Sequence, residues 1–143
     1  MSEEDQKSFF ERIDKLTLNN KAKFGKMNVH HVLPHCADQI RMALGTKKSL
    51  EYGKVDPKKI LSLVKTGKPV PTPKGFGQVE GHGTPPTTLE GDKIILKEYI
   101  IKFSQLENSF KFHPNTYFGD IPREKWTSLI KYHLNHHLDQ FGV

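Results

Sequence analysis

The sequence predicts an all-α fold, specifically a four-helix bundle with long loops. Several long segments carry apolar residues at helical spacing, capping residues mark several of their ends, and no segment reads convincingly as a β-strand. With 143 residues the chain fits a single domain, residues 1–143. Helices that each carry one apolar stripe bury those stripes against one another, which favours a bundle.

The first predicted helix covers residues 2 to about 18, with Ser2 ahead of three acidic residues that suit a helix N-terminus. The second begins after Asn28, a good N-cap, and ends near Leu44, where Gly45 stops it. Pro34 lies inside this second helix and removes one backbone hydrogen bond, so we expect a kink or bulge beside His35.

The second half of the chain predicts a short helix, a long loop and two long helices. Asp56 caps a short helix over residues 56–65, with Pro57 at its first position. Residues 67–89 are rich in proline and glycine, which indicates a long loop that is either a binding segment or a surface connector. Helices follow over residues 90–107 and 122–141, the last closed by Gly142.

Composition limits the classes of function. The chain contains one cysteine, Cys36, which excludes an internal disulfide and a cysteine-rich zinc site, and we expect a buried, inert thiol. No apolar run approaches the roughly 18 residues that cross a bilayer, and the acidic N-terminus does not resemble a signal peptide, so we expect a soluble, cytoplasmic protein without a membrane partner. The net charge of +6 admits a nucleic-acid partner, but the lysines are scattered and we favour a solvated surface.

Two of the eight histidines stand out on the last predicted helix. His133 and His137 project within roughly 20° of the centre of its apolar stripe, one turn apart, while His136 projects about 80° away. Histidines at this spacing can offer two nitrogens to one metal ion. The alternative at this point is a pair of core histidines that hydrogen-bond within the protein.

A third ligand would have to come from another helix. On the second predicted helix His35 projects about 120° from the stripe centre and His31 about 160° away, so His35 is the better candidate. Three neutral imidazoles would leave a coordination position open, as in catalytic metal sites. Gln140 lies near the same helical face as the histidine pair, where it can orient a ligand or a substrate.

Several motifs resemble the DinB/YfiT-like superfamily, and within it a bacterial branch known only as a domain of unknown function. They are Phe24-Gly25-Lys26-Met27, His35-Cys36-Ala37-Asp38, His113-Pro114, Phe118-Gly119, Trp126 and the closing run from His133 to Gly142. The resemblance implies a bundle with up-down-down-up topology and a metal site made by His35, His133 and His137. It also implies metal-dependent transferases that use low-molecular-weight thiols, and frequent homodimers. Pro34 departs from the pattern, which leaves the geometry at His35 open.

The sequence therefore predicts a protein that binds one divalent metal ion, with zinc or nickel expected and manganese or iron as alternatives. It would act as a thiol S-transferase or hydrolase on an electrophilic small molecule, with a thiol as co-substrate. The alternatives are a non-catalytic metal or small-molecule binding module, a bundle with unoccupied core histidines, and a nucleic-acid binder. Residues expected to line the pocket or contact the ligands are His31, Gln39, His113, Phe118, His136 and Gln140.

Overall fold

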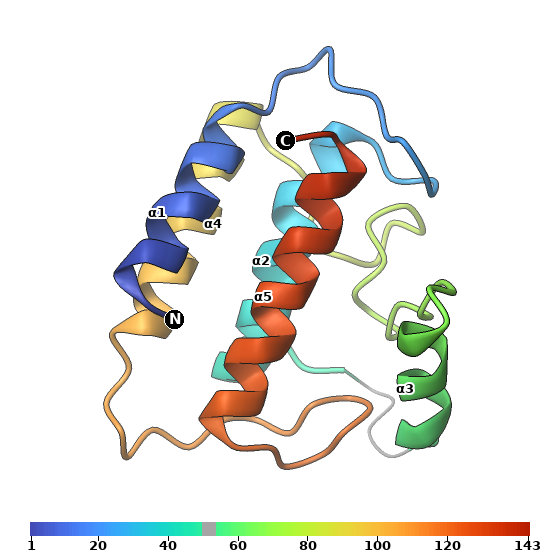
Figure 1. The fold of residues 1–143 in the computed structure, drawn as a ribbon, viewed down its shortest axis with the longest axis vertical. Coiled ribbons are helices and arrows are strands. Elements are labelled where there is room, and N and C mark those ends of the chain that lie inside the picture. The colour runs from blue at the N-terminus through green and yellow to red at the C-terminus, as the bar shows by residue number, and fades with distance from the viewer. Residues whose placement is uncertain (50–53) are drawn as a thin grey trace.

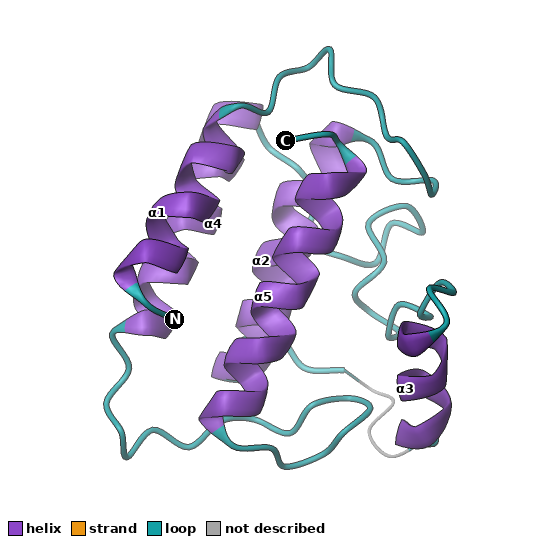
Figure 2. Cartoon of the chain, viewed as in Figure 1, coloured by secondary structure: helices purple, strands orange, loops and turns teal. Residues whose placement is uncertain are grey.

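The computed structural model describes residues 1–49 and 54–143. This part of the chain contains five α-helices and no β-strand, so the all-α prediction is confirmed (Figure 2). The helices are α1 (Glu3–Asp14), α2 (Val29–Leu44), α3 (Pro57–Lys65), α4 (Leu89–Ser104) and α5 (Arg123–Gln140).

Helix α1 begins with a capping box and ends earlier than predicted. The Ser2 hydroxyl accepts a hydrogen bond from the Asp5 amide, and the Asp5 carboxylate accepts one from the Ser2 amide, both at 3.1 Å. The helix ends at Asp14 rather than near residue 18, because the side chain of Asn20 accepts the Thr17 amide at 2.6 Å and so turns the chain away from the helix.

Helix α2 has the predicted ends. The side chain of Asn28 accepts from the amides of His30 and His31, and Gly45 ends the helix with a left-handed φ of 76°. The helix continues without a break through the buried Pro34. The expected irregularity therefore does not interrupt the helix that carries His35.

The remaining helices also begin near their predicted starts, and Asp56 is the predicted cap of α3. Asp56 caps α3 through the amide of Lys58 at 2.9 Å, and Thr88 caps α4 through the amide of Gly91 at 3.1 Å. Helix α4 ends at Ser104, a few residues before the predicted end. None of the helices is long and apolar enough to cross a membrane, as far as the described residues extend.

Four long helices pack side by side, and α3 stands apart from them. Helices α1 and α2 each pack against both α4 and α5. Helices α1 and α5 run in one direction and α2 and α4 in the other (Figure 1). The apolar stripes meet in one core, to which Ile13, Leu33, Ile100, Phe103, Trp126, Ile130 and Leu134 contribute fully buried side chains.

The long loop between α3 and α4 is folded back onto α2. Phe76 is buried in the main core cluster, and the hydroxyl of Tyr117 donates a hydrogen bond to the carbonyl oxygen of Pro71. Thr84 contacts α2 through the carboxylate of Asp38. Helix α2 is consequently covered by α4, α5 and this loop, and polar side chains on its loop-facing side are buried.

Candidate metal centre

The candidate metal centre begins with two histidines on α5. His133 and His137 are separated by one helical turn, and their side chains therefore lie on the same face of the helix. Their Nε2 atoms are 3.1 Å apart, and their rings meet edge to face at 4.5 Å between centroids. His137 is buried and His133 is half-buried.

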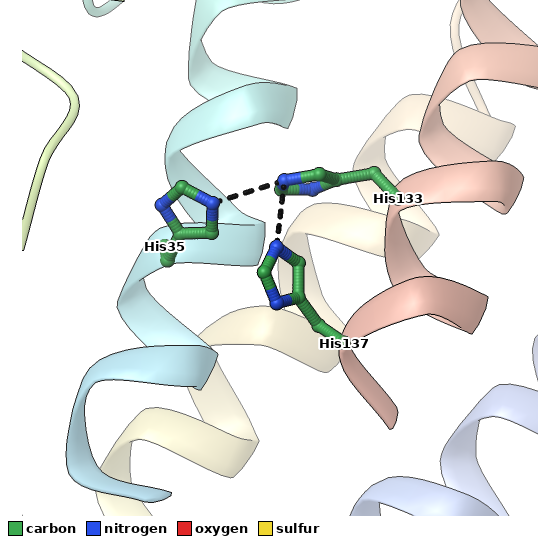
Figure 3. A group of neighbouring side chains, drawn as sticks. All are labelled: His35, His133 and His137. Carbon is green, nitrogen blue, oxygen red and sulfur yellow. Dashed lines mark hydrogen bonds between the residues drawn. The ribbon is translucent and has the colours of Figure 1, made fainter. Parts of the chain in front are cut away.

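The third histidine comes from α2. His35 is buried, and its Nε2 lies 3.0 Å from Nε2 of His133. One nitrogen from each of the three histidines lies within 4.8 Å of the others, and Figure 3 shows the rings turned toward a common centre. A zinc site needs at least three histidine, cysteine, aspartate or glutamate side chains close together. Among the described residues, these three histidines form such a group.

A glutamine from the long loop fixes the tautomer of His35. The Oε1 of Gln78 lies 2.8 Å from His35 Nδ1, and its Nε2 donates to the carboxylate of Asp38 at 2.8 Å. A carboxylate only accepts hydrogen bonds, so the amide oxygen of Gln78 must face the histidine. An amide oxygen also only accepts hydrogen bonds, so Nδ1 of His35 must carry the ring hydrogen. Nε2 of the neutral ring is then unprotonated, and its lone pair can bind a metal ion.

A second glutamine does the same for His137. Gln140 Oε1 lies 2.8 Å from His137 Nδ1, and Gln140 Nε2 donates to the backbone carbonyl of Phe24 at 2.7 Å. By the same reasoning the hydrogen of neutral His137 is on Nδ1, and its Nε2 is unprotonated.

These assignments leave the three Nε2 atoms without enough hydrogens. His133 Nε2 can donate one hydrogen, to either His35 or His137, so at least one of the contacts at 3.0 and 3.1 Å joins two unprotonated nitrogens. In addition, Nδ1 of His133 is buried and has no hydrogen-bond partner in the described part of the chain. A cation shared by the three lone pairs would remove this repulsion, whereas hydrogen bonding within the protein does not.

The electrostatics favour neutral rings. Burial lowers the pKa of His137 to about 3, with the neighbouring His35 adding to the effect. Burial also lowers the pKa of His133 well below its ordinary value, and that of His35 despite the opposing hydrogen bond to Gln78. At neutral pH all three imidazoles are therefore in the form that binds metal.

The donor set and its spacing fit a divalent transition metal. Imidazole nitrogens suit zinc, nickel, copper and iron, whereas magnesium and calcium prefer oxygen. Ligands about 2.0–2.1 Å from a tetrahedral zinc ion lie roughly 3.3 Å from one another, close to the 3.0 and 3.1 Å that separate Nε2 of His133 from Nε2 of His35 and His137. Three ligands also leave one position of a tetrahedron for another molecule.

The other residues expected at the pocket are distributed unevenly. Gln140 contacts His137, and His136 is exposed with its ring 4.9 Å from that of His137. His31 and Gln39 lie one turn before and after His35, each half-buried with a buried polar atom that has no partner among the described residues.

Two of the expected residues lie away from the histidines. The amide of His113 donates to the carbonyl of Ala43, which is about 12 Å along α2 from His35. The amide of Phe118 donates to Asn115 within a tight turn. The structure does not bring either residue to the three histidines.

The sequence did not point to Gln78 or to a role for Asp38. Gln78 lies in an irregular loop, where no periodicity indicates which way a side chain faces. Asp38 offered one signal, since a carboxylate three residues from His35 on a largely apolar helix calls for a partner when it is buried. Its partners in the loop, Gln78 and Thr84, however, lie 40 and 46 residues away.

Comparisons of the chain with protein-family models, with curated proteins and with solved structures found no match.

Proposed function

We propose that this protein binds one divalent transition-metal ion through Nε2 of His35, His133 and His137. The observation that carries the proposal is the shortage of hydrogens among these three nitrogens, which glutamine acceptors enforce at two of them. Zinc and nickel are our first candidates, and manganese and iron are the alternatives.

We further propose that the site is catalytic and acts on a thiol or a water molecule. When bound, a divalent ion with an open position supplies a Lewis acid that lowers the pKa of a coordinated thiol or water. In a thiol transfer, sulfur would form a bond to an electrophilic carbon, the leaving group would depart with its electron pair, and the thiol proton would pass to solvent.

The protein's own residues support such a role by orientation and exclusion of water. Gln78 and Gln140 hold two rings with Nε2 free, and burial keeps the rings neutral. The half-buried His133 leaves one side of the centre less covered than the other two histidines.

The resemblance to the DinB/YfiT-like superfamily supports the same proposal. It implies ligands from the second long helix and the last one, and α2 and α5 are the helices that carry the three histidines. In chain order the four long helices run up, down, down and up, which supports the topology that the resemblance implies (Figure 1). Membership, a low-molecular-weight thiol co-substrate and a homodimer remain part of the proposal.

The test is the metal content of untagged protein by plasma mass spectrometry. Wild type should contain close to one transition-metal ion per chain, His133→Ala should contain almost none, and His136→Ala should behave as wild type because His136 is exposed and holds no ligand position. Absence of metal in wild type, even after incubation with zinc, nickel and manganese, would overturn the proposal.

A second test separates catalysis from metal binding alone. Cobalt(II)-loaded wild type is titrated with bacillithiol, mycothiol and glutathione while the visible absorption is followed. A sulfur-to-cobalt charge-transfer band, together with turnover of an alkyl halide or epoxide, supports the transferase. Stoichiometric metal without such a band and without turnover of thiol or water would favour the non-catalytic binding module.

A further inference from the structure

Gln78 connects a candidate metal ligand to a buried ionic cluster. Its side chain is buried, its Oε1 is 2.8 Å from His35 Nδ1, and its Nε2 is 2.8 Å from the carboxylate of Asp38. His35 and Asp38 belong to α2, whereas Gln78 comes from the loop between α3 and α4. One side chain thus links the loop to the metal centre and to α2 at the same time.

Asp38 anchors this loop on α2. The carboxylate is completely buried and accepts from Arg41 Nη1 at 2.8 Å, Thr84 Oγ1 at 2.6 Å, the Thr84 amide at 2.8 Å and Gln78 Nε2 at 2.8 Å. A buried carboxylate is stable only when it is hydrogen-bonded and paired in this way. Three of its four bonds come from the loop, so the loop cannot leave α2 without exposing or orphaning the charge.

A glycine makes room for the Gln78 amide. A methyl group added at Gly83 would lie 2.2 Å from Gln78 Nε2 and 2.3 Å from its Cδ, well inside van der Waals contact. The loop therefore folds so that Gly83 backs the amide group while Thr84, the next residue, binds Asp38. The Gln78 amide is thus held by His35 at its oxygen, by Asp38 at its nitrogen and by the backbone of Gly83 against its side.

We propose that Gln78 is a positioning residue that couples metal binding at His35 to the seating of loop residues 76–84 on α2. This inference rests on the proposed metal site. A metal ion needs the tautomer of His35 with its hydrogen on Nδ1, and the Gln78 oxygen selects that tautomer. Because coupling between two equilibria is reciprocal, metal binding favours the seated loop as much as the seated loop favours metal binding.

The other acceptor near His35 is a weaker candidate for the same task. The carbonyl oxygen of Phe76 lies 3.4 Å from His35 Nδ1, near the limit for a hydrogen bond, whereas Gln78 is at 2.8 Å. If Phe76 were sufficient, removal of the Gln78 amide would leave metal affinity unchanged. The inference can therefore be tested at a single side chain.

The experiment measures zinc affinity by chelator competition in four variants. Gln78→Leu removes the acceptor while nearly conserving volume, and Gly83→Ala displaces an intact Gln78 amide. Thr84→Val is the matched control, since it removes a loop hydroxyl from Asp38 but leaves the contact between Gln78 and His35 in place. His133→Ala reports the loss of a ligand.

We expect Gln78→Leu and Gly83→Ala to weaken zinc binding by about 10-fold to 100-fold, the usual effect of removing a group that orients a metal ligand. Thr84→Val should stay within about threefold of wild type, since the orienting contact is kept. The cobalt(II) absorption spectrum should change in the first two variants and not in the third, a result that general destabilisation of the fold would not give.

Hydrogen exchange followed by mass spectrometry tests the reciprocal effect. In wild type, zinc should slow exchange across residues 76–84 at least about tenfold, and in Gln78→Leu this protection should be lost, while exchange in α1 serves as an internal control. Wild-type affinity in both Gln78→Leu and Gly83→Ala, or equal protection of the loop by zinc in Gln78→Leu, would overturn the coupling while leaving the metal site intact. Absence of zinc binding in wild type would instead overturn the metal site and the coupling with it.

Discussion

Two of the three candidate ligands are oriented in the same chemical way, but the two contacts are built differently. His137 and Gln140 are three residues apart on α5, so one helix brings them together. His35 and Gln78 are 43 residues apart and meet only when the loop folds onto α2. The same hydrogen bond, 2.8 Å long in both cases, thus depends on local structure on one side and on tertiary structure on the other.

This difference indicates which side of the centre is open to regulation. The contact on α5 joins two residues of one helix, and Gln140 also donates to the backbone carbonyl of Phe24. The contact on α2 is made or lost with the loop that Asp38 anchors. We therefore expect changes in the loop that move the Gln78 amide to affect metal binding through His35, and changes in residues 23–25 to affect it through His137.

The largest effect should follow from removal of the loop's anchor. Asp38→Ala leaves Arg41, Thr84 and Gln78 without their common acceptor, and we expect a loss of about 3 kcal/mol in the free energy of unfolding. Urea denaturation measures it. The control is Asp139→Ala, which removes an exposed ion pair with Arg12 and should cost less than about 1 kcal/mol. Equal losses of unfolding free energy in Asp38→Ala and Asp139→Ala would show that the buried carboxylate contributes no more to stability than the exposed one.

The next effect tests the contact on α5 directly. Gln140→Leu removes the acceptor for His137 Nδ1, and we expect about 10-fold to 100-fold weaker zinc binding, as for Gln78→Leu. The two variants should differ in the loop: zinc should still slow hydrogen exchange at residues 76–84 in Gln140→Leu. Gln105→Leu, at the end of α4, is the control for a glutamine outside the site. Loss of loop protection in Gln140→Leu would mean that the two sides are not independent.

A third prediction concerns pH in the metal-free protein. The unfolded chain takes up a proton at His137 near pH 6.5, whereas the pKa in the folded state is about 3. The unfolded state therefore binds more protons between these values, and stability falls as the pH is lowered through this range, by about 1.4 kcal/mol per pH unit for this residue. Between pH 7 and pH 5, urea denaturation should show about 2 kcal/mol more loss in wild type than in His137→Leu.

If His35 is removed instead of His137, the difference from wild type in the loss of unfolding free energy between pH 7 and pH 5 should be smaller. The acceptors Gln78 and Phe76 and the nearby carboxylate of Asp38 oppose the effect of burial on the pKa of His35. Equal pH dependence in wild type and His137→Leu would contradict a neutral, buried ring at position 137.

The smallest effect separates two glycines that both need a left-handed backbone. Gly25 has φ 76°, and a methyl group there would lie 2.8 Å from Gln140 Nε2, whereas Gly75 has φ 92° and open space around it. Each change to alanine should cost about 1 kcal/mol of stability because of the backbone conformation. Only Gly25→Ala should also weaken zinc binding, by roughly threefold, because it disturbs the amide that orients His137. Equal zinc affinity in the two variants would contradict an effect of Gly25 on His137 through the Gln140 amide.

Much of the fold could be predicted because its signals are local. The sequence predicts the caps Ser2, Asn28 and Asp56, and each accepts a hydrogen bond from an amide two or three residues ahead. The apolar pattern predicts an end near residue 18 for α1, whereas the helix ends at Asp14 and the Asn20 side chain turns the chain that follows. Pro34 predicts a kink or bulge in α2, but the helix continues through it without a break.

The local sequence is enough to predict that helices form and that His133 and His137 share one face of α5. Both depend on neighbours within about four residues, which is the range of a helical turn. Which nitrogen of His35 is free depends instead on the tertiary structure, because the loop residue Gln78 selects the tautomer and is itself held by the buried Asp38. Hydrogen bonds between residues 40 or more apart leave no periodic trace in a sequence, and they form only after the loop has folded onto its helix.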